Sequence, residues 1–421
     1  MEPRKKLKIL HTVETYFPSQ NGMAEVVKQV SERLAKRGHH VVVATSSSKQ
    51  RRKMIHNNVE IKPFWIFGKR SFCIFGTTSK YKNFLQNSKF DIITNFAAEH
   101  WASDLIFPYL DKLKAKKIFV PTGFPSINNL LFYQYYKKMK TWIKKYNAIV
   151  FLSKNQNDYK FAKKHFFGKQ LVIPNGASTS EFCNKKKLEI LKNNQHPKNK
   201  KIIHVSGYLS IAKGQLEAIQ IFSQSNISNA TLFLICPEFY EKNSFKNLCK
   251  KIARGIFWFF RGHGLRNLLL RTTIFSEINK YDKINKLYNR EVKTLVLSRN
   301  ETVSAFLEAD LLLFPSWIEC APLVVYEAVA SKTPFCISNV GNAKELVKKF
   351  QSGVLLPTKK CKSNLKNVNI SKSVLVLNKI FLNKKKLDKK VLNSYKVWKK
   401  NFTWDIIANK YEYLYNHLLK S

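Results

Sequence analysis

Short apolar runs alternate along this chain with segments of helical periodicity, and the alternation begins twice. The first apolar run, Leu7–Val13, leads into a polar loop at Phe17–Gly22. A helical segment follows, and its apolar residues share one face at Val26, Val27, Val30 and Leu34. Basic residues and Gly38 then predict the end of the helix, and Val41–Ala44 predicts the next strand. A continuous valine run is typical of a parallel strand that is covered on both faces.

The second start has the same order of elements. Lys201–Ser206 predicts a strand, Gly207–Gly214 a loop and Gln215–Ser223 a helix. Further strands are expected at Ala230–Cys236, Asp91–Asn95, Ile118–Val120, Ala148–Leu152, Leu311–Phe314 and Phe335–Ser338. This alternation predicts two doubly wound α/β domains with parallel sheets. Such sheets bind ligands at the carboxyl ends of their strands, so a cleft between the two domains is the expected site.

The length of 421 residues also favours more than one domain, because a single core stops growing well before that size. The stretch 184–200 is polar, rich in Lys and Asn, and contains Pro197, which is typical of a linker. We therefore expect an N-terminal domain at 1–183 and a second domain that begins at 201.

Composition bears on location and partners. The seven cysteines are odd in number and show no C-x-x-C spacing, which indicates reduced thiols in the cytoplasm, without a disulfide framework or a zinc site. The first residues lack a secretory pattern, and no apolar run is long enough to span a bilayer. The net charge of +47 favours polyanions such as nucleic acid, anionic lipid headgroups or phosphorylated substrates. An AT-rich coding sequence would produce the same charge, and composition leaves both explanations open.

Missing motifs argue against three common functions. Neither first loop carries G-x-G-x-x-G followed by a suitably spaced acid, as NAD and FAD enzymes require. The P-loop motif G-x-x-x-x-G-K-[ST] is also absent from the sequence. A nucleic-acid-binding protein would suit the charge, but the chain has neither an RNP-like aromatic run nor a helix-turn-helix pattern. We therefore expect no nucleic acid partner.

The segment Asp310–Pro334 combines a buried strand, a loop and a helix with two acidic residues. Glu319 lies in the loop, and Glu327 lies in the second turn of the predicted helix. An ordinary surface helix would explain Glu327 by itself. However, valines and alanines surround Glu327, and an acid inside such an apolar helix needs a partner. Both glutamates are therefore candidate site residues.

The N-terminus of this helix is a candidate anion site. Pro322 suits the first helical position, because its missing N–H group would have no partner there. No Ser, Thr, Asp or Asn stands immediately before it to cap the helix, so the N–H groups of Leu323 and Val324 are available. The helix dipole favours a phosphate at that end.

The same segment resembles the E-x(7)-E signature of glycosyltransferase family 4, the retaining enzymes of the GT-B fold. The spacing from Glu319 to Glu327 matches, as do the Pro-Ser pair before it and the Glu-Ala-x-Ala-x-x-x-Pro after it. The resemblance implies that Glu327 accepts hydrogen bonds from the donor ribose. It implies that Glu319 lies at the sugar, where it positions the donor and helps to stabilise charge at the anomeric carbon. It also places Ser316 among the donor-binding residues, and the amides of Leu323 and Val324 at the diphosphate.

Two loops match the same family. Phe17–Glu25 resembles its first loop, whose glycine approaches the diphosphate, and Gly22 is what remains of the usual glycine pair. Gly207–Gly214 resembles a loop in which an Arg and a Lys neutralise the leaving diphosphate. Lys213 keeps the lysine, whereas Tyr208 stands at the arginine position.

Two further stretches complete the resemblance. Val172–Gly176 resembles the stretch that closes the N-terminal domain, and Phe402–Ala408 resembles the last helix, which crosses back onto that domain. The resemblance therefore implies a donor-binding domain at 201–395 and a crossing helix at 396–421.

Signals on the acceptor side are weaker. The stretches Asn95–Ser103 and Pro121–Ser126 follow predicted strands, which makes Glu99 and His100 candidates. Many relatives have a His where this chain has Thr122, which is the third candidate. A His beside a Trp is also common as a packed structural residue, and the sequence leaves both readings open.

The resemblance implies a metal-independent enzyme without a cofactor, since the GT-B fold needs no Asp-x-Asp motif and none follows a strand here. Its expected substrates are a nucleotide-diphosphate sugar and an acceptor glycan or lipid-linked glycan, in cell-envelope polysaccharide or lipopolysaccharide synthesis. The alternative is a catalytically weak or inactive relative that acts as a basic scaffold on a membrane or nucleic acid. The basic aromatic segments Phe132–Tyr146 and Lys246–Arg271 would suit peripheral binding to an anionic membrane.

Overall fold

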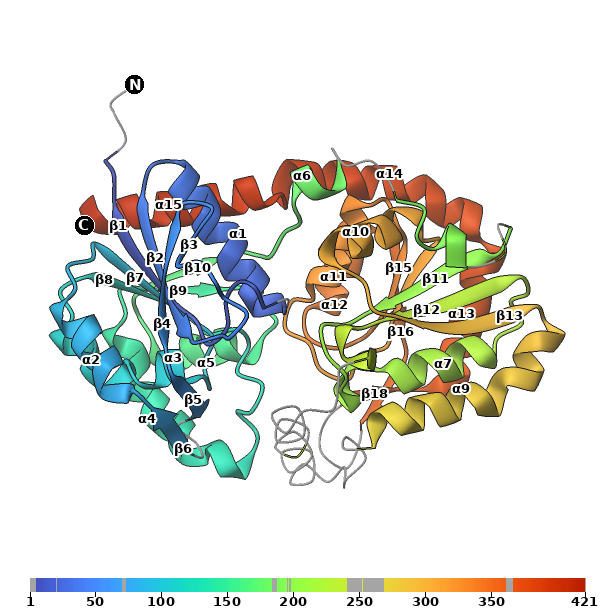
Figure 1. Cartoon of the computed structure of the whole chain (residues 1–421), viewed down its shortest axis with the longest axis horizontal. Helices are drawn as coiled ribbons and strands as arrows, with labels where there is room; N and C mark the ends of the chain where they lie inside the picture. The colour runs from blue at the N-terminus through green and yellow to red at the C-terminus, as the bar shows by residue number, and fades with distance from the viewer. Residues whose placement is uncertain are drawn as a thin grey trace. The chain divides into compact units, whose positions relative to one another are not determined.

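The computed structural model describes residues 5–420 except 20, 70–72, 184–187, 195, 197, 241–251, 253–268 and 361–365. The chain forms two compact units: unit 1 comprises Met1–Asn175 and Trp404–Ser421, and unit 2 comprises Gly176–Thr403. Each unit contains a mainly parallel sheet with helices packed against it (Figure 1). The predicted class of two doubly wound α/β domains is confirmed.

Unit 1 is built on an eight-stranded sheet in the order β10-β9-β8-β7-β1-β2-β4-β3. Its strands are β1 Lys8–Thr12, β2 His40–Ser46, β3 Ile55–His56, β4 Val59–Phe64, β7 Ile92–Phe96, β8 Lys116–Val120, β9 Ala148–Phe151 and β10 Lys169–Val172. The pairs are parallel apart from β3 with β4, and a separate antiparallel hairpin joins β5 Ile66–Lys69 to β6 Cys73–Gly76. The central strands are buried along their whole length, as the continuous apolar runs predict.

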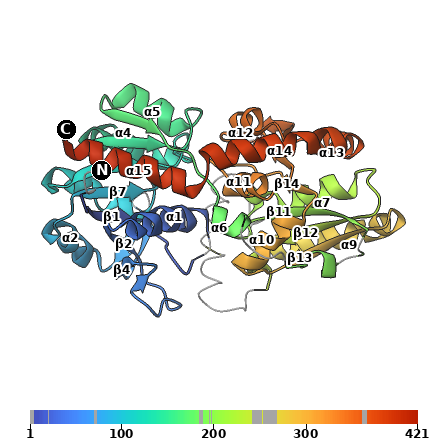
Figure 2. The ribbon, with the colours of Figure 1, turned by 90° about the horizontal axis from the view of Figure 1, so that it is seen from above.

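The helices of unit 1 cover this sheet. They are α1 Gly22–Lys36, α2 Thr78–Asn87, α3 Trp101–Asp104, α4 Tyr133–Trp142, α5 Asn157–His165 and α15 Trp404–Lys420, with 3₁₀ turns at Phe107–Lys112, Leu130–Phe132 and Ile143–Lys145. The apolar face of α1 is buried as its periodicity predicts. The helix α15 runs beside α1, as Figures 1 and 2 show, so the end of the chain packs with its beginning. A buried Tyr415 hydroxyl fixes this packing, lying 3.0 Å from Nε2 of His11 on β1.

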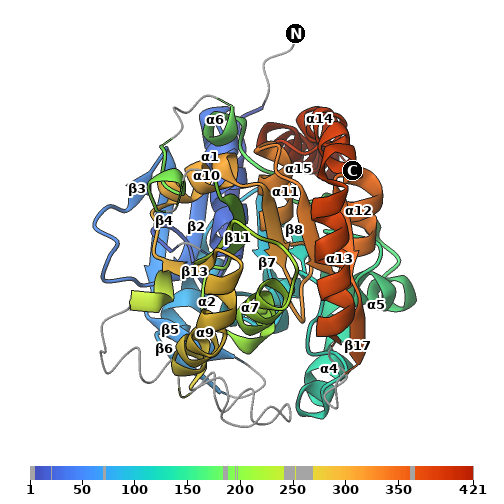
Figure 3. The ribbon, with the colours of Figure 1, turned by 90° about the vertical axis from the view of Figure 1, so that its right-hand side faces the viewer.

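Unit 2 is built on a six-stranded parallel sheet in the order β13-β12-β11-β14-β15-β16. Its strands are β11 Lys200–Val205, β12 Ala230–Ile235, β13 Arg290–Leu295, β14 Leu311–Phe314, β15 Phe335–Ser338 and β16 Gly353–Leu356, with a small pair β17 Thr358–Lys360 and β18 Lys366–Val368. Its helices are α6 Thr179–Phe182, α7 Gln215–Ser223, α9 Leu270–Leu287, α10 Arg299–Glu308, α11 Leu323–Ala330, α12 Ala343–Phe350, α13 Ile370–Leu382 and α14 Lys384–Asn401; 3₁₀ turns lie at Lys192–Asn194, Ile211–Lys213 and Pro237–Tyr240. The helices α7, α9 and α13 form one apolar layer with the sheet, and α10, α11, α12 and α14 form the other. Figure 3 shows α7 and α9 side by side in the first of these layers.

Each sheet reverses its strand order once. In unit 1 the chain proceeds from β1 through β2 to β4 and then returns to the other side of β1 with β7. In unit 2 it proceeds from β11 through β12 to β13 and then returns to the other side of β11 with β14. The adjacent connections therefore leave in opposite directions at β1/β7 and at β11/β14, and a ligand can enter between them at the carboxyl ends of the strands. These two switch points are where a site is expected.

The segment around the expected linker packs against unit 2 where it is described. Leu191 is fully buried, and its amide N–H donates to a carboxylate oxygen of Glu308 on α10 at 3.2 Å. The amide of Lys192 donates to the other oxygen of the same carboxylate at 2.9 Å. Residues 176–183, which we expected to belong to the N-terminal domain, lie within unit 2.

Across the described ranges, no helix combines the length and apolarity that a bilayer span requires. Five cysteines in those ranges are free thiols, namely Cys73, Cys183, Cys236, Cys320 and Cys336.

Candidate active site

An ion pair occupies the switch point of unit 2. Nζ of Lys213, in the loop after β11, lies 2.7 Å from Oε1 of Glu319, in the loop after β14. Their side chains are 18% and 12% exposed, so the pair is largely screened from solvent. Burial lowers the pKa of the Lys213 ammonium group, but the Glu319 carboxylate outweighs this effect and the net pKa lies above the usual value. The lysine is therefore a permanent positive charge at this point.

The backbone around the pair is held by close contacts. Oγ of Ser316 lies 2.9 Å from Oε1 of Glu319 and 2.8 Å from the carbonyl oxygen of Ala212. Gly214 has a φ of +76°, and a Cβ atom there would lie 2.2 Å from the carbonyl oxygen of Pro315. The loop after β11 thus approaches the end of β14 more closely than a side chain would permit.

Two aromatic rings complete the surroundings of Lys213. Its Nζ lies 5.4 Å from the centroid of the Tyr208 ring, within the range of a cation–π contact. Tyr208 therefore contacts the lysine without adding a positive charge of its own. Below it, Nε2 of the buried His204 lies 2.8 Å from the Lys213 carbonyl oxygen. Burial lowers the pKa of His204 to about 4, so the imidazole is neutral and its role is to fix the backbone of the loop.

The helix α11 follows the loop that carries Glu319. It runs from Leu323 to Ala330, and its N-cap is Pro322, which makes no side-chain capping hydrogen bond. The helix thus begins one residue later than a proline at the first helical position would require. The first N–H groups of a helix have no partner within it, so the amides of Leu323 and Val324 can bind an anion.

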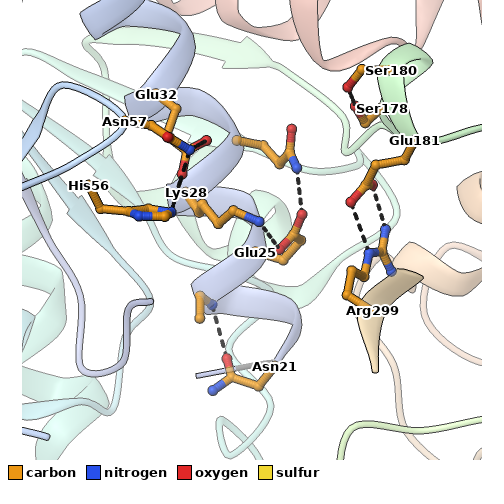
Figure 4. A network of polar contacts seen from close by, with 12 residues as sticks. Asn21, Glu25, Lys28, Glu32, His56, Asn57, Ser178, Ser180, Glu181 and Arg299 are labelled. Carbon is orange, nitrogen blue, oxygen red and sulfur yellow. Dashed lines mark hydrogen bonds and ion pairs between the residues drawn. The ribbon is translucent and has the colours of Figure 1, made fainter. Parts of the chain in front are cut away.

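Glu327 has a partner that the sequence did not reveal. Its Oε1 lies 2.6 Å from Nη1 of Arg299, at the start of α10. Arg299 also faces Glu181 on α6 with two nitrogens, at 3.1 Å and 2.8 Å (Figure 4). The Glu327 side chain is 8% exposed, so the acid inside the apolar helix is paired rather than solvated.

A contact between an imidazole and a carboxylate lies at the switch point of unit 1. Nδ1 of His100, after β7, contacts Oε2 of Glu14, after β1. Both side chains are about one-third exposed, at 33% and 29%, so the pair is accessible from solvent. His100 is therefore oriented by a carboxylate rather than packed in the core.

Glu99 is held differently from its neighbour. It is 4% exposed, and its carboxylate accepts hydrogen bonds from the Ser126 hydroxyl at 2.7 Å and from the Tyr136 hydroxyl. Burial and the Glu99 carboxylate raise the pKa of Tyr136, so the phenol keeps its proton and remains a donor. Glu99 thus ties the loop after β7 to the loop after β8.

The backbone is strained at the same edge of the sheet. Ala97, Glu99, Thr122 and Phe124 all have positive φ values, between +49° and +65°. Such values are uncommon outside glycine and are unfavourable for the β-branched Thr122 in particular. Clusters of this kind occur at functional sites, where the surrounding structure imposes them.

Gly22, the remaining donor-side candidate, lies at the start of a helix in unit 1. Gly22 is the first residue of α1, whose N-terminus is capped by the Asn21 side chain through the amide of Ala24 at 2.9 Å (Figure 4). Among the described residues, no group of three or more His, Cys, Asp or Glu side chains could hold a metal ion.

Solved structures share this architecture over nearly the whole chain. Sucrose-phosphate synthase from Thermosynechococcus elongatus is 14% identical with a TM-score of 0.74, covering 99% of this chain and 100% of that one. Anabaena HepE, whose structure contains UDP and glucose, is 14% identical with a TM-score of 0.71, covering 98% and 100%. WaaG, a glycosyltransferase involved in lipopolysaccharide biosynthesis, is 15% identical with a TM-score of 0.61, covering 96% and 99%. The fold is that of the GT-B glycosyltransferases.

Sequence families identify the chain more closely. Residues 20–181 match Glycosyltransferase Family 4, and residues 278–369 match Glycosyl transferases group 1. The two matches together span more than half of the chain, which therefore belongs to this group of glycosyltransferases. A search of curated proteins finds no significant match to the sequence.

The close approach at Gly214 leads to a first prediction. We expect Gly214→Ala to lower the free energy of unfolding by more than about 1 kcal/mol, because alanine is disfavoured at positive φ and its Cβ would also displace Pro315. Displacement of Lys213 from Glu319 should lower glycosyltransferase activity about 10²-fold. Denaturant unfolding and steady-state kinetics measure the two effects.

Gly38→Ala is the matched control for this change. Gly38 also has a positive φ, of +91°, but its Cβ would meet only the end of the Lys6 side chain, at 3.7 Å. It should lose stability only through its positive φ, and it should keep full activity. Full activity in Gly214→Ala would show that the close approach is irrelevant to the site.

Proposed function

We propose that this glycosyltransferase is a retaining, metal-independent enzyme that transfers a sugar from a nucleoside-diphosphate sugar to a glycan or lipid-linked glycan. The observation that carries the proposal is the Lys213–Glu319 pair at the switch point of unit 2. It combines a fixed positive charge for a leaving diphosphate with a carboxylate for the sugar. Envelope polysaccharide or lipopolysaccharide synthesis is the proposed setting, in line with the involvement of the similar WaaG in lipopolysaccharide biosynthesis.

In this proposal the donor is held at three points. The amides of Leu323 and Val324 and the ammonium group of Lys213 bind the diphosphate, where positive groups stabilise the negative charge that develops on departure. Glu327 accepts hydrogen bonds from the ribose hydroxyls. Glu319 lies at the sugar and stabilises positive charge at the anomeric carbon. Gly22 and Ser316 stand among the donor-binding residues.

The acceptor side of the proposal rests on unit 1. His100 is oriented by Glu14, and an imidazole so placed can accept a hydrogen bond from an acceptor hydroxyl. We assign Glu99 and Thr122 to shaping this region, since Glu99 is bound to Ser126 and Tyr136 and Thr122 lies in the strained loop. Tyr208 stands where the family has an arginine and carries no positive charge. We therefore assign Lys213 as the principal side-chain charge for the leaving group.

A donor screen tests the proposed function. Purified protein is incubated with UDP-, GDP- and ADP-sugars, and donor hydrolysis and thermal shift are measured with and without EDTA. UDP-glucose is the first donor to try, because the HepE structure contains UDP and glucose. We expect one nucleotide to stabilise the protein and turnover to persist in EDTA. Nuclear magnetic resonance of the product should show the anomeric configuration of the donor.

Three results would count against the proposal. Binding without turnover of any donor would favour the inactive scaffold. Loss of turnover in EDTA that Mg²⁺ or Mn²⁺ restores would contradict metal independence. An inverted anomer would contradict retention.

We also propose that unit 1 docks on an anionic membrane surface through the segment that follows β8. Leu130, Leu131 and Tyr133 are 90%, 51% and 61% exposed, which is unusual for large apolar side chains. The lysines of α4 are exposed beside them, at Lys137, Lys138 and Lys140. The apolar stripe at Phe132, Tyr136, Met139 and Ile143 is buried in the core and is not part of this surface. The other segment, Lys246–Arg271, lies almost entirely outside the described residues.

Liposome sedimentation tests the membrane surface. We expect binding to vesicles containing phosphatidylserine to fall steeply with salt, because surface attraction is screened within about 8–10 Å near physiological ionic strength. The double change Leu130→Ser with Leu131→Ser should weaken this binding, whereas Leu382→Ser, at a leucine on α13 that is 85% exposed, should not. Equal binding to neutral vesicles, or no binding at all, would contradict the membrane surface. The high net charge would then be explained by an AT-rich coding sequence.

A further inference from the structure

Arg299 stands at a position that helix electrostatics disfavour. It is the first residue of α10, whose start is fixed by Ser298 and Glu301 in a capping box. The N-terminus of a helix carries the positive end of its dipole, so a cation there is unfavourable by itself. Other groups must therefore hold the guanidinium in place.

Two carboxylates and one ring are among those groups. Nε and Nη2 of Arg299 bind the two oxygens of Glu181 at 3.1 Å and 2.8 Å, and Nη1 binds Glu327 at 2.6 Å. The Arg299 guanidinium carbon also lies 5.9 Å from the centroid of the Phe182 ring. The paired parallel bonds to Glu181 fix the plane of the guanidinium, because this fork geometry tolerates little rotation.

The arrangement makes Glu181 an anchor and Glu327 the group that is oriented. Glu181 lies on α6, shortly after the point where the chain enters unit 2, and α6 packs against α10 and α11. Arg299 therefore connects a fixed carboxylate on one helix to the Glu327 carboxylate on another. A carboxylate can accept several hydrogen bonds, so a guanidinium on one oxygen is compatible with hydroxyl donors as well.

Removing the guanidinium would change Glu327 in two ways. A nearly buried carboxylate without its counter-charge is costly, so it would take up a proton or turn towards solvent. Either change removes the fixed, ionised acceptor that a ribose would need.

We propose that Arg299, anchored by Glu181, is the positioning residue that holds Glu327 ionised and oriented for the donor ribose. The inference rests on the proposed function, in which Glu327 accepts hydrogen bonds from that ribose. It adds two residues, Arg299 and Glu181, that no motif in the chain indicates. They act through Glu327 and do not contact the sugar or the diphosphate.

Calorimetric titration with three probes tests the proposal: UDP, 2′,3′-dideoxy-UDP and inorganic pyrophosphate. If the donor screen selects GDP or ADP, the corresponding pair of that nucleotide is used. Wild type should bind UDP at least tenfold more tightly than the dideoxy analogue. Each hydrogen bond to a charged group changes a dissociation constant by about tenfold or more. In Arg299→Gln this ratio should fall towards one, whereas the dissociation constant of pyrophosphate should stay within about threefold.

Two further variants and a control complete the design. Glu181→Gln should give an intermediate ratio, because it leaves Arg299 charged but without its anchor. Arg299→Lys should also be intermediate, since an ammonium group cannot bind Glu181 through a fork. These two carry the test if Arg299→Gln does not fold. Lys192→Gln removes a cation that pairs with Glu189 at the surface of unit 2 and should leave the ratio unchanged.

The possible outcomes test the role of Arg299 separately from the proposed role of Glu327. If the ratio of the dissociation constants of the dideoxy analogue and UDP is unchanged in Arg299→Gln, the positioning role is overturned. Glu327 then remains the group that accepts hydrogen bonds from the ribose. An equal loss of affinity for all three probes would also overturn it, because that result indicates general damage to unit 2. A ratio near one in wild type would overturn the ribose assignment of Glu327 and the positioning role together.

Discussion

Lys213→Ala is expected to lower kcat by roughly 10²–10³ and to raise KM for the donor much less. The reason lies in the departure of the diphosphate, which gains negative charge as the anomeric bond breaks. A positive group already in place stabilises that charge most when the site is shielded from water, and the Lys213 side chain is 18% exposed. Tyr208 contacts this lysine but carries no positive charge, so the residue at this position of the loop does not share the task.

Steady-state kinetics with the donor found in the screen measure the effect. Tyr208→Arg should be tolerated and should partly restore the rate of Lys213→Ala, because it returns a cation to the same loop. Lys280→Ala is the matched control, since Lys280 also pairs with a glutamate and lies 5.2 Å from a tyrosine ring centroid, but on α9. Activity within a few-fold of wild type in Lys213→Ala would show that another group holds the diphosphate.

Glu327→Ala is expected to abolish stabilisation by nucleotide while changing the melting temperature of the free protein by only a few degrees. The free protein should tolerate the change because Arg299 keeps both of its bonds to Glu181. A ligand at 100 times its dissociation constant stabilises by about 2.7 kcal/mol. If binding weakens about 100-fold, the same concentration contributes only about 0.4 kcal/mol, which is a small shift.

Thermal unfolding with and without nucleotide measures this difference. Glu291→Ala serves as the control, because Glu291 is half-exposed on β13 and pairs only with Lys293 among the ion pairs of the described chain. A Glu327→Ala protein that nucleotide stabilises as strongly as wild type would contradict the ribose assignment. The comparison with Arg299→Gln then separates loss of the carboxylate from loss of its orientation.

Much of the fold could be predicted from the sequence because it depends on local patterns. The helix Gln215–Ser223 and the strand Phe335–Ser338 have the predicted bounds. The first strand is shorter than predicted by one residue at each end, and the first helix begins at the last residue of the predicted loop. Buried parallel strands appear in the sequence as continuous apolar runs. In amphipathic helices, apolar residues recur with the period of the helix. The start of α11 differs from the prediction by one residue, since Pro322 serves as the N-cap rather than as the first helical residue.

The candidate site was only partly predictable. Lys213 and Glu319 were recognised separately by their motifs, and Glu327 by an acid in an apolar helix. Their partners were not recognised, because an isolated Arg299 or Glu14 resembles any other surface charge in a chain of net charge +47. One signal for Arg299 was its place directly after Ser298. Ser298 suits the N-terminus of a helix, where a cation is disfavoured.

By itself, the sequence determined the two β-α-β starts, the doubly wound class and the spacing of the glutamates, since each depends on residues close together along the chain. Only the tertiary structure decided which charges meet. Lys213 and Glu319 are 106 positions apart and pair because the order of the sheet sets β11 beside β14. In the same way β1 lies beside β7, which joins Glu14 to His100. Strand order is set by the packing of all elements around a shared core, and no local pattern encodes it.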